Sequence, residues 1–358
     1  MKHLIFVAII LILSIVFYVS SISHLHIVPV LVILLIFDKY KRGAKKELKA
    51  ESSGKGLLFN KNVIVTGGSS GIGKCVAIAA AENGANVTII ARNPEKLVIA
   101  RDEIDSACCN KIGQRIGCVV LDLSQDYEDI EEAFTDLEKQ QGPCYMLVNC
   151  AGMSICSKIE DTSPDLVKHL MNLNFLGSYY CAKAVVPSMK LAKRGKIVFV
   201  SSQAGLLGIF GYSAYCATKF ALKGLAESLA MELAPYNVSV TLSLPPDTDT
   251  PGYVVEEQSK LVETKLISAS GGLVSPEIVA RRLLDDALDE NFFSTVGWES
   301  YVLTTLCSGM SPLSSFFELI FQTLLMGPLK MCSAFFHYHF KSIVIQCMTE
   351  RENRKKIH

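Results

Sequence analysis

The stretch NVIVTGGSSGIG, residues 62–73, decides the fold of this chain of 358 residues. A short run rich in β-branched residues, typical of a buried strand, leads directly into a cluster of glycines. Glycine permits a tight turn and lets backbone N–H groups approach a pyrophosphate, and the N-terminus of the following helix adds positive potential. The stretch therefore predicts a dinucleotide-binding turn, with cofactor contacts from Gly67, Ser69, Ser70, Gly71, Ile72 and Gly73.

Strand-like and helix-like segments alternate after this turn. Further strands are predicted at 86–91, 117–122, 145–149, 196–201 and 238–244, and amphipathic helices at 72–83, 94–106, 126–140 and 163–191. Strands that are apolar on both faces and are separated by crossover helices indicate a parallel sheet covered on both sides. The sequence thus predicts an α/β fold, a Rossmann-type doubly wound parallel sheet with helices on both faces, as a catalytic domain over residues 60–305.

The end of the second predicted strand indicates which dinucleotide is bound. Sites for NAD usually place a carboxylate here to accept from the ribose 2′-hydroxyl, but this chain has Ala91 and Arg92. Arginine holds a 2′-phosphate by charge-assisted hydrogen bonds, whereas a carboxylate repels it. We therefore expect NADPH as the cofactor, with Arg92 and Lys96 near the phosphate and Asp122 near the adenine amino group.

A tyrosine and a lysine lie four positions apart in GYSAYCATKFALKG, residues 211–224. Residues i and i+4 share one face of a helix, so Tyr215 and Lys219 are expected to lie side by side. Taken alone, this spacing favours core packing beside a surface lysine over chemistry.

The segments TGGSSGIG, NCAG, SS and YCATK occur in this order, and with them the chain resembles the short-chain dehydrogenase/reductase family over roughly residues 60–300. The resemblance implies a catalytic set of Asn174, Ser202, Tyr215 and Lys219, with Ser201 as a competing candidate for the serine. It also implies cofactor contacts from Tyr215 and Lys219 and from Leu123, Asn149, Thr248 and Thr250.

Two positions depart from the family pattern. Cys150 replaces the second asparagine of the usual Asn-Asn-Ala-Gly, where a small thiol should fit the same turn. Pro245-Pro246 replaces the usual Pro-Gly pair and stiffens the loop that leads to Thr248 and Thr250.

The chemistry implied is reduction of a carbonyl group. An ammonium beside a phenol favours the phenolate, so we expect Lys219 to lower the pKa of Tyr215 from its usual value near ~10. Ser202 would hydrogen-bond the carbonyl oxygen, and Asn174 would hold a water that links Lys219 to solvent. The segment at about 252–275 is expected to form a flexible lid over the substrate.

The amino-acid composition argues against some classes of binding partner. Lys+Arg and Asp+Glu are equal at 35 each, so the chain has no net positive electrostatic field that would favour nucleic acid. The 12 cysteines show no zinc-ligand spacing, so we expect no metal and reduced thiols. The sequence leaves open whether the chain forms a homo-oligomer.

The N-terminal region is apolar and then basic. Residues 4–22 are long enough for a membrane-spanning helix, although a cleaved signal peptide is an alternative, and 27–37 is a shorter apolar run. We expect a membrane anchor at 1–37 and a basic linker at 38–59, whose Lys and Arg residues indicate the cytosolic side.

The C-terminal region at 306–348 is also apolar and is expected to associate with the bilayer, with packing on the catalytic domain as the alternative. Gly327-Pro328 is expected to divide it into two helices. In the basic cytosolic tail at 349–358, Lys355 and Lys356 resemble a dilysine retrieval signal of the endoplasmic reticulum.

Further segments indicate a substrate class. LDLSQDY, MLVNCAGM, PYNV, PPDTDTPG and CSGM resemble one branch of the family, whose members reduce the ketone of a long-chain lipid with NADPH at the cytosolic face of the endoplasmic reticulum membrane. One alternative is a membrane-bound member acting on steroids or retinoids. The other is an inactive lipid-binding scaffold, although such a protein usually lacks the tyrosine or the lysine.

Overall fold

The structure, a computed structural model, describes residues 56–110, 113–269 and 272–357. The N-terminal anchor expected at 1–37 lies outside the described residues, as does the linker expected at 38–59 up to residue 55. The chain divides into two compact units, of which the larger ends at Tyr301.

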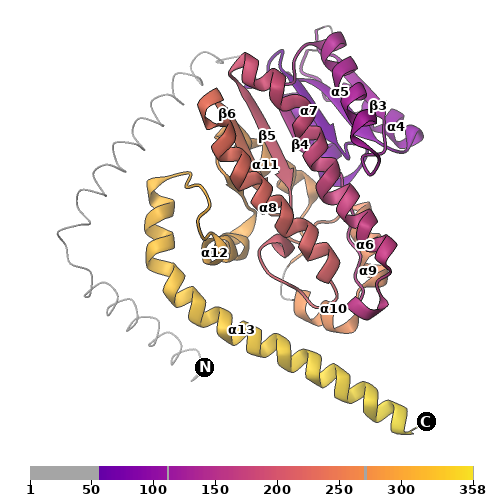
Figure 1. Cartoon of the computed structure of the whole chain (residues 1–358), viewed down its shortest axis with the longest axis vertical. Coiled ribbons are helices and arrows are strands. Elements are labelled where there is room, and N and C mark those ends of the chain that lie inside the picture. The colour runs from indigo at the N-terminus through magenta and orange to yellow at the C-terminus, as the bar shows by residue number, and fades with distance from the viewer. Residues whose placement is uncertain (1–55, 111–112, 270–271, 358) are drawn as a thin grey trace, which may run out of the picture. The chain divides into compact units, whose positions relative to one another are not determined.

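One parallel sheet forms the centre of the larger unit (Figure 1). Its strands are β1 (Asn62–Thr66), β2 (Asn86–Ala91), β3 (Ile116–Val120), β4 (Met146–Asn149), β5 (Gly195–Val200), β6 (Val238–Ser243) and β7 (Phe293–Ser294). They pair in the order β3-β2-β1-β4-β5-β6-β7. The order reverses between β1 and β4, as in doubly wound dinucleotide folds, where ligands bind outside the carboxyl ends of the strands at this point. The predicted fold class is confirmed.

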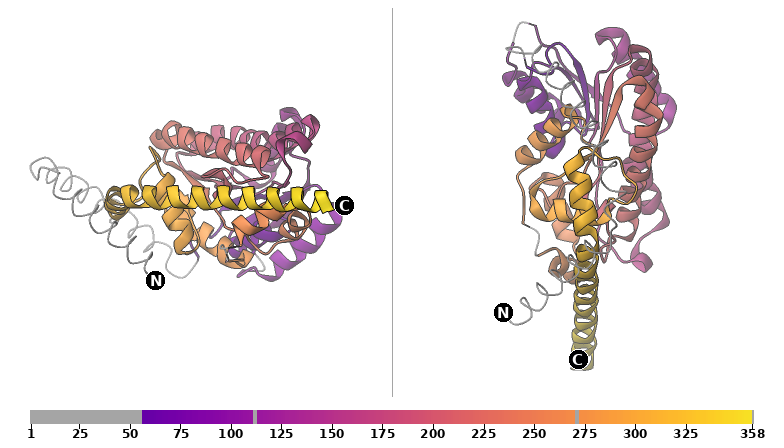
Figure 2. Two further views of the ribbon diagram at one scale, coloured as in Figure 1. Left: turned by 90° about the horizontal axis from the view of Figure 1, so that it is seen from below. Right: turned by 90° about the vertical axis from the view of Figure 1, so that its left-hand side faces the viewer.

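Helices cover both faces of the sheet. They are α3 (Gly71–Glu82), α4 (Pro94–Ser106) and α11 (Pro276–Leu288) on one face, and α5 (Tyr127–Gln141), α7 (Gly177–Ala192) and α8 (Ser213–Leu233) on the other. The right-hand view of Figure 2 shows the two layers, with indigo and orange helices on one side of the strands and magenta and red helices on the other. Because both faces are covered, the central strands consist almost wholly of buried residues. This explains why their sequences are continuous apolar runs.

The helix predicted at 163–191 is interrupted. It consists of α6 (Pro164–Met171), a π-helical turn η2 (Asn172–Leu176) and then α7. Such turns contain one extra residue within a helix and are frequent at functional sites. Short 3₁₀ turns also occur, namely η1 (Ile159–Asp161), η3 (Gln203–Gly205) and η4 (Ala234–Tyr236).

The segment expected to be a flexible lid is mostly helical in its described part. It contains α9 (Pro251–Ser259) and α10 (Val262–Ser268), which lie with α6 at the lower end of the domain in Figure 1. The Oγ1 atom of Thr250 accepts a hydrogen bond from the Tyr253 N–H at 3.1 Å, and Pro251 occupies the first helical position. A side-chain cap followed by proline is a strong helix start, and it outweighs the loop character suggested by the prolines and glycine.

The smaller unit contains the end of α12 (Gly297–Cys307) and the long helix α13 (Phe316–Ile357), which is yellow in Figure 1. The predicted division of this region at Gly327-Pro328 is wrong, because α13 continues through Pro328. A proline removes one backbone hydrogen bond, and the many other bonds of a long helix maintain it. The part Phe316–Arg354 contains a window of 18 residues with a mean hydropathy of 1.4, and by length and composition it is a candidate membrane span.

Candidate active site

The glycines of the loop after β1 occupy positions where a larger side chain would be strained or would collide with neighbouring atoms. Gly67 has φ +66° and Gly71 has φ +54°, values that favour glycine. A Cβ on Gly73 would lie 2.4 Å from the carbonyl oxygen of Gly67, and one on Gly67 would lie 2.9 Å from the backbone of Ala151. The loop therefore packs its own backbone closely against the turn that follows β4.

The N-terminus of α3 at the end of this loop suits an anion. Ser70 is the N-cap residue, but its side chain makes no capping hydrogen bond, and the first turn contains no acidic residue. Backbone N–H groups at such a helix start have no intrahelical partner and favour negative charge. This is the arrangement expected around a pyrophosphate.

The loop after β6 lies against the glycine-rich loop. A Cβ on Gly71 would lie 3.0 Å from Cγ2 of Thr250, although about 180 residues separate the two positions. The Thr248 hydroxyl is buried and donates to the carbonyl oxygen of Pro246 at 2.8 Å. Thr248 also forms a parallel bridge with Val274. Thr250 thus lies against the glycine-rich loop, and the side-chain oxygen of each predicted threonine is already used within the protein.

A buried amide at the end of β4 has no hydrogen-bond partner among the residues that the structure describes. Asn149 is 2% exposed, and neither its side-chain oxygen nor its nitrogen makes a hydrogen bond. An unsatisfied amide at this depth is costly, so it points to a polar ligand. Nearby, Thr66 Oγ1 accepts from the N–H groups of Cys150 and Ala151 at 3.1 Å each. The Cys150 variant therefore keeps the turn after β4 held to β1, as expected.

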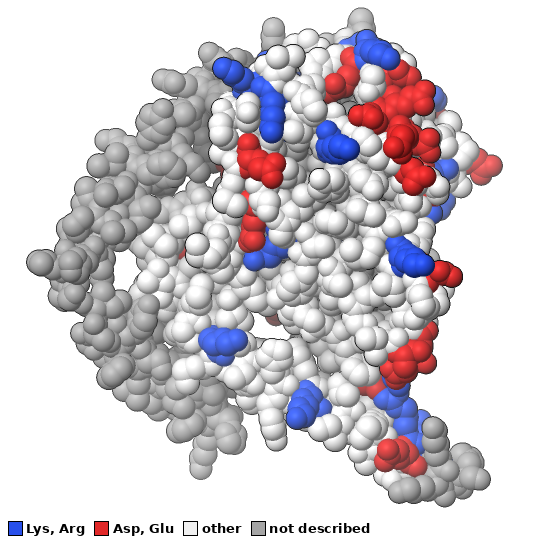
Figure 3. Space-filling model, viewed as in Figure 1, with Lys and Arg blue, Asp and Glu red and all other residues white. Residues whose placement is uncertain are grey.

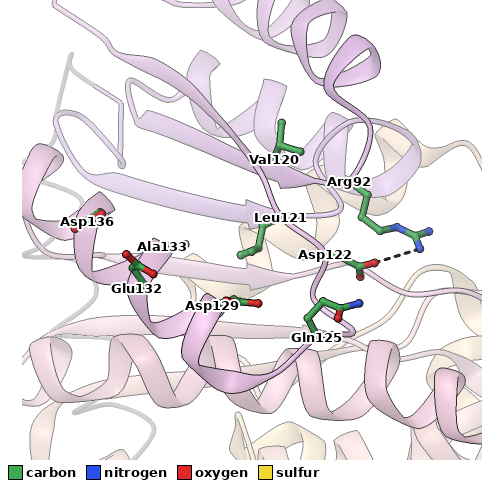
Figure 4. Close-up of a pocket in the computed structure, with 9 residues that line it drawn as sticks. All are labelled: Arg92, Val120, Leu121, Asp122, Gln125, Asp129, Glu132, Ala133 and Asp136. Carbon is green, nitrogen blue, oxygen red and sulfur yellow. Dashed lines mark ion pairs between the residues drawn. The ribbon is translucent and has the colours of Figure 1, made fainter.

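A cavity of about 600 Å³ opens beside the ends of β2 and β3 (Figure 4). Arg92 Nη1 lies 3.9 Å from Asp122 Oδ2, and the Arg92 side chain is 56% exposed. Burial opposes the charge on Asp122, but hydrogen bonds from Ser124 and the charge of Arg92 outweigh it and lower the pKa of this carboxyl. Arg92 is thus a solvent-accessible cation at the place where sequence predicts the 2′-phosphate.

The opposite wall of this cavity is acidic. Figure 3 shows carboxylates gathered over the region of α5, where the exposed side chains include Asp129, Glu132 and Asp136. These carboxylates repel a phosphate, so an anion in the cavity would be drawn toward Arg92.

The remaining residues predicted to contact the cofactor differ in the burial of their side chains. Ile72 packs against the core, and Leu123 is 4% exposed, so its side chain contributes packing. Lys96 lies near the start of α4 with an exposed side chain, and its N–H donates to the Asn93 side chain at 2.8 Å. Ser69 is partly exposed in the glycine-rich loop.

Helix α8 places Tyr215 and Lys219 on one face. The ammonium of Lys219 is 5.7 Å from the ring centroid of Tyr215 and donates to the carbonyl oxygen of Val200 at 2.9 Å. Val200 ends β5, so the lysine ties the helix to the carboxyl end of a central strand.

The two candidate serines have different surroundings. Ser202 shares a hydrogen bond with the Tyr215 side chain and accepts from the Ala204 N–H at 3.1 Å. Ser201 is 3% exposed and donates to the carbonyl oxygen of Lys219 at 3.0 Å. The geometry brings Ser202, and not Ser201, to the tyrosine.

The π-helical turn brings Asn174 to the same place. Its buried side chain accepts from the Met153 N–H at 2.9 Å and donates to the Met153 carbonyl at 2.9 Å and to Thr218 Oγ1 at 3.0 Å. A Cβ on Gly152 would lie 3.0 Å from Asn174 Oδ1 and 3.6 Å from Lys219 Nζ. All four predicted catalytic residues therefore lie together at the carboxyl edge of the sheet.

The electrostatics of the pair differ from the expectation. Burial lowers the pKa of Lys219 to about 8. Burial and the nearby Glu256 carboxylate raise the pKa of Tyr215 above its ordinary value, and the hydrogen bond with Ser202 acts in the opposite direction. The predicted lowering of the Tyr215 pKa is wrong here, because burial and the charge of Glu256 disfavour the phenolate.

Sequence reasoning missed one charged residue of this site, Glu256 on α9. Its carboxylate accepts hydrogen bonds from the Tyr212 hydroxyl and the Ser154 hydroxyl. Lys260 lies one turn further along α9, 3.7 Å from the Glu256 carboxylate. The pair Glu256 and Lys260 at i and i+4 was the available signal, and it predicts an ion pair on a helix.

The arrangement suits transfer of a hydride and a proton to or from a carbonyl group. A buried phenol, a serine hydroxyl and an ammonium converge next to a loop shaped for a dinucleotide pyrophosphate. The orphaned amide of Asn149, the close-packed glycines and exposed Arg92 fit a phosphorylated dinucleotide.

Comparisons with known proteins agree with this geometry. A family model described as short chain dehydrogenase matches residues 61–260. The chain is 47% identical over 294 residues to a 3-ketodihydrosphingosine reductase of Bos taurus, covering 82% of this chain and 88% of that one. It is 46% identical to a 3-dehydrosphinganine reductase of Danio rerio, covering 83% and 90%.

A solved structure shares the fold. The crystal structure of a metagenomic short-chain oxidoreductase in complex with NADP has a TM-score of 0.55 and 30% identity, covering 67% of this chain and 96% of that chain. With the matched segment spanning both the glycine-rich loop and the Tyr215–Lys219 helix, the chain belongs to the short-chain dehydrogenase family.

Proposed function

We propose that this chain is an NADPH-dependent oxidoreductase that reduces the C3 ketone of 3-ketodihydrosphingosine to the alcohol of dihydrosphingosine, a step of sphingolipid synthesis. The observation that carries the proposal is the convergence of Ser202, Tyr215 and Lys219 beside the glycine-rich loop. The names of the Bos taurus and Danio rerio relatives support the substrate.

The cofactor site uses backbone and side chains already described. The loop from Gly67 to Gly73 and the start of α3 would hold the pyrophosphate, and Asn149 would pair with a polar group of the nucleotide. Arg92 would bind the 2′-phosphate, which supports NADPH over NADH. When bound, NADPH supplies the hydride that adds to the ketone carbon.

The protein supplies position and the proton. Ser202 donates a hydrogen bond to the ketone oxygen, where negative charge develops, and Tyr215 transfers its phenolic proton to that oxygen. Because the pKa of Tyr215 is raised, the phenol stays protonated at neutral pH and is ready to donate. Lys219 stabilises the phenolate that remains on Tyr215. Asn174 lies beside Lys219 and would hold a water through which the phenolate regains its proton from solvent. Hydride and proton together convert the ketone to the alcohol.

The membrane assignment is also a proposal. The candidate span in α13 and the long alkyl chain of the substrate are compatible with membrane association. We infer that the domain faces the cytosol at the endoplasmic reticulum, with the anchor at 1–37, the apolar region at 306–348 and the tail at 349–358 that contains Lys355 and Lys356. Protease protection of both termini in intact microsomes tests this topology, and a protected catalytic domain would contradict it.

The activity is tested with purified full chain in detergent. NADPH oxidation should depend on added 3-ketodihydrosphingosine, and Tyr215→Phe should lower kcat at least about a thousandfold while NADPH still binds. Tyr236→Phe is a matched control in η4, which follows α8, and its ring contacts Lys190. Turnover of steroid or retinoid carbonyls without turnover of the lipid ketone would overturn the substrate. Full cellular function of Tyr215→Phe would favour a scaffold.

A further inference from the structure

The lid helix α9 places a carboxylate next to the catalytic tyrosine. Glu256 accepts from Tyr212, whose ring centroid lies 5.6 Å from that of Tyr215. Its charge also contributes, after burial, to the raised pKa of Tyr215. Glu256 is therefore linked to Tyr215 through the ring of Tyr212, and its side chain is only 16% exposed.

The nearest cation is largely engaged elsewhere. Lys260 has a side chain that is 1% exposed, and it lies 2.6 Å from Glu257, 3.0 Å from Asp247 and 3.7 Å from Glu256. The last distance is longer than a hydrogen bond. Three carboxylates thus share one ammonium, and the further cation that acts on Glu257 is Lys265 on α10. Of the three carboxylates, Glu256 lies farthest from the Lys260 ammonium.

Neutral hydroxyls hold the Glu256 carboxylate in place. Tyr212 donates to one of its oxygens and Ser154 donates to the other. An ionised carboxylate has about four acceptor positions, so two of them stay available after these bonds. Tyr212 directly precedes α8 and Ser154 follows the turn after β4, and both elements belong to the catalytic site. The carboxylate is therefore fixed relative to Tyr215 although it lies on a lid helix.

The proposed substrate has a group that suits this position. Its C2 carbon, bonded to the ketone carbon, bears a primary amine, which is an ammonium at neutral pH. With the ketone oxygen at Ser202 and Tyr215, the ammonium must lie within two bonds of the carbonyl carbon. We propose that Glu256 binds the C2 ammonium and so selects an amino ketone over a neutral ketone, an inference that rests on the proposed function. Glu256 is then a specificity-determining residue.

The test compares two substrates on one enzyme. The full chain in detergent is assayed with 3-ketodihydrosphingosine and with its deamino analogue, 1-hydroxyoctadecan-3-one. Wild type should prefer the amino ketone by about a hundredfold in kcat/KM, as for loss of a close charge pair. Glu256→Gln should lose that preference, because kcat/KM for the amino ketone should fall far more than kcat/KM for the deamino ketone, whereas any effect through Tyr215 changes both substrates alike.

Glu257→Gln is the matched control, because it removes a neighbouring carboxylate of the same helix that contacts Lys260. It should keep the preference for the amino ketone. Tyr212→Phe, which removes one hydroxyl that orients Glu256, should reduce the preference partly.

The outcomes separate the two proposals. If wild type does not discriminate between the two ketones, the inference is wrong. It is also wrong if Glu256→Gln lowers kcat/KM equally for both ketones, because Glu256 then acts on the fold and not on the ammonium. If wild type reduces the deamino ketone but not the amino ketone, the proposed function itself fails. If wild type reduces the amino ketone and Glu256→Gln retains the preference, only the inference fails.

Discussion

The Ser201 hydroxyl donates to the backbone carbonyl of Lys219 at 3.0 Å, so this serine ties the end of β5 to the middle of α8. Its neighbour Ser202 faces Tyr215 instead. Of the two adjacent serines, Ser201 thus supports the packing of α8 and Ser202 lies at the catalytic tyrosine.

Substitution of these serines should separate the two roles. Ser202→Ala should lower kcat about a hundredfold or more, because a donor to the developing oxyanion is lost. Ser201→Ala should retain kcat and lower the free energy of unfolding by about 1 kcal/mol, because a buried carbonyl loses its donor. Steady-state kinetics and urea unfolding of both variants check this. Equal losses of kcat in the two variants would contradict the assignment.

Lys219 should cost stability while it serves catalysis. Its pKa is about 8 in the native state and near the ordinary 10.5 when unfolded, so the unfolded chain binds more protons between these values. The free energy of unfolding of wild type should therefore rise with pH from about 8 to about 10. Below pH 8 the full penalty applies, about 3 kcal/mol from the shift.

The variant Lys219→Met should remove that penalty and also the hydrogen bond to Val200, worth about 1 kcal/mol. We expect it to be inactive yet more stable than wild type at pH 7 by about 2 kcal/mol, with the difference shrinking toward pH 10. Urea unfolding at both pH values measures this. A variant that is less stable at pH 7 would show that the lysine is not a buried charge.

Arg92 should determine cofactor choice. Arg92→Ala should raise the KM for NADPH about 10- to 100-fold and leave that for NADH unchanged, because only the 2′-phosphate loses a charged partner. Arg101→Ala is the control, since this exposed arginine of α4 pairs with Asp102. Equal changes with both cofactors would place Arg92 outside the 2′-phosphate site.

Two glycines should respond oppositely to alanine. Gly73→Ala forces a Cβ to 2.4 Å from a backbone oxygen, so we expect lost NADPH binding and at least about 2 kcal/mol of destabilisation. Gly224 lies in α8, and apart from the helix's own backbone no described residue has an atom within 4 Å of an added Cβ, so Gly224→Ala should stabilise by about 0.5–1 kcal/mol. Thermal unfolding and NADPH fluorescence titration distinguish them. A Gly73→Ala protein that binds NADPH normally would contradict the close packing.

Sequence patterns were sufficient for most of the sheet. The first six strands follow the predicted apolar runs, because all but the edge strand β3 consist mostly of buried residues. The strand β7 has only Phe293 and Ser294, too short for any periodic signal. Helix α9 was missed because it depends on the side-chain cap at Thr250, and a single threonine is a weak sequence signal. Helix α10 has no side-chain cap at its N-terminus.

For the active site, the spacing of residues in the sequence predicts which side chains come together but does not predict their pKa values. Tyr215 and Lys219 are neighbours as predicted, yet burial and Glu256 control the pKa of the phenol. Burial depends on packing of the whole domain, and Glu256 approaches from an element about 40 residues later. Neither is visible in local sequence.

The π-helical turn at Asn172–Leu176 has a consequence for how this enzyme tolerates change in length. Each residue of an α-helix rotates the following ones by about 100°. Deleting one residue between α6 and α7 would therefore restore an ordinary helix and swing the amide of Asn174 away from Thr218. Substitutions around this turn leave the rotation of α7 relative to α6 unchanged, whereas a single insertion or deletion changes it. The number of residues is therefore constrained here more strictly than their type.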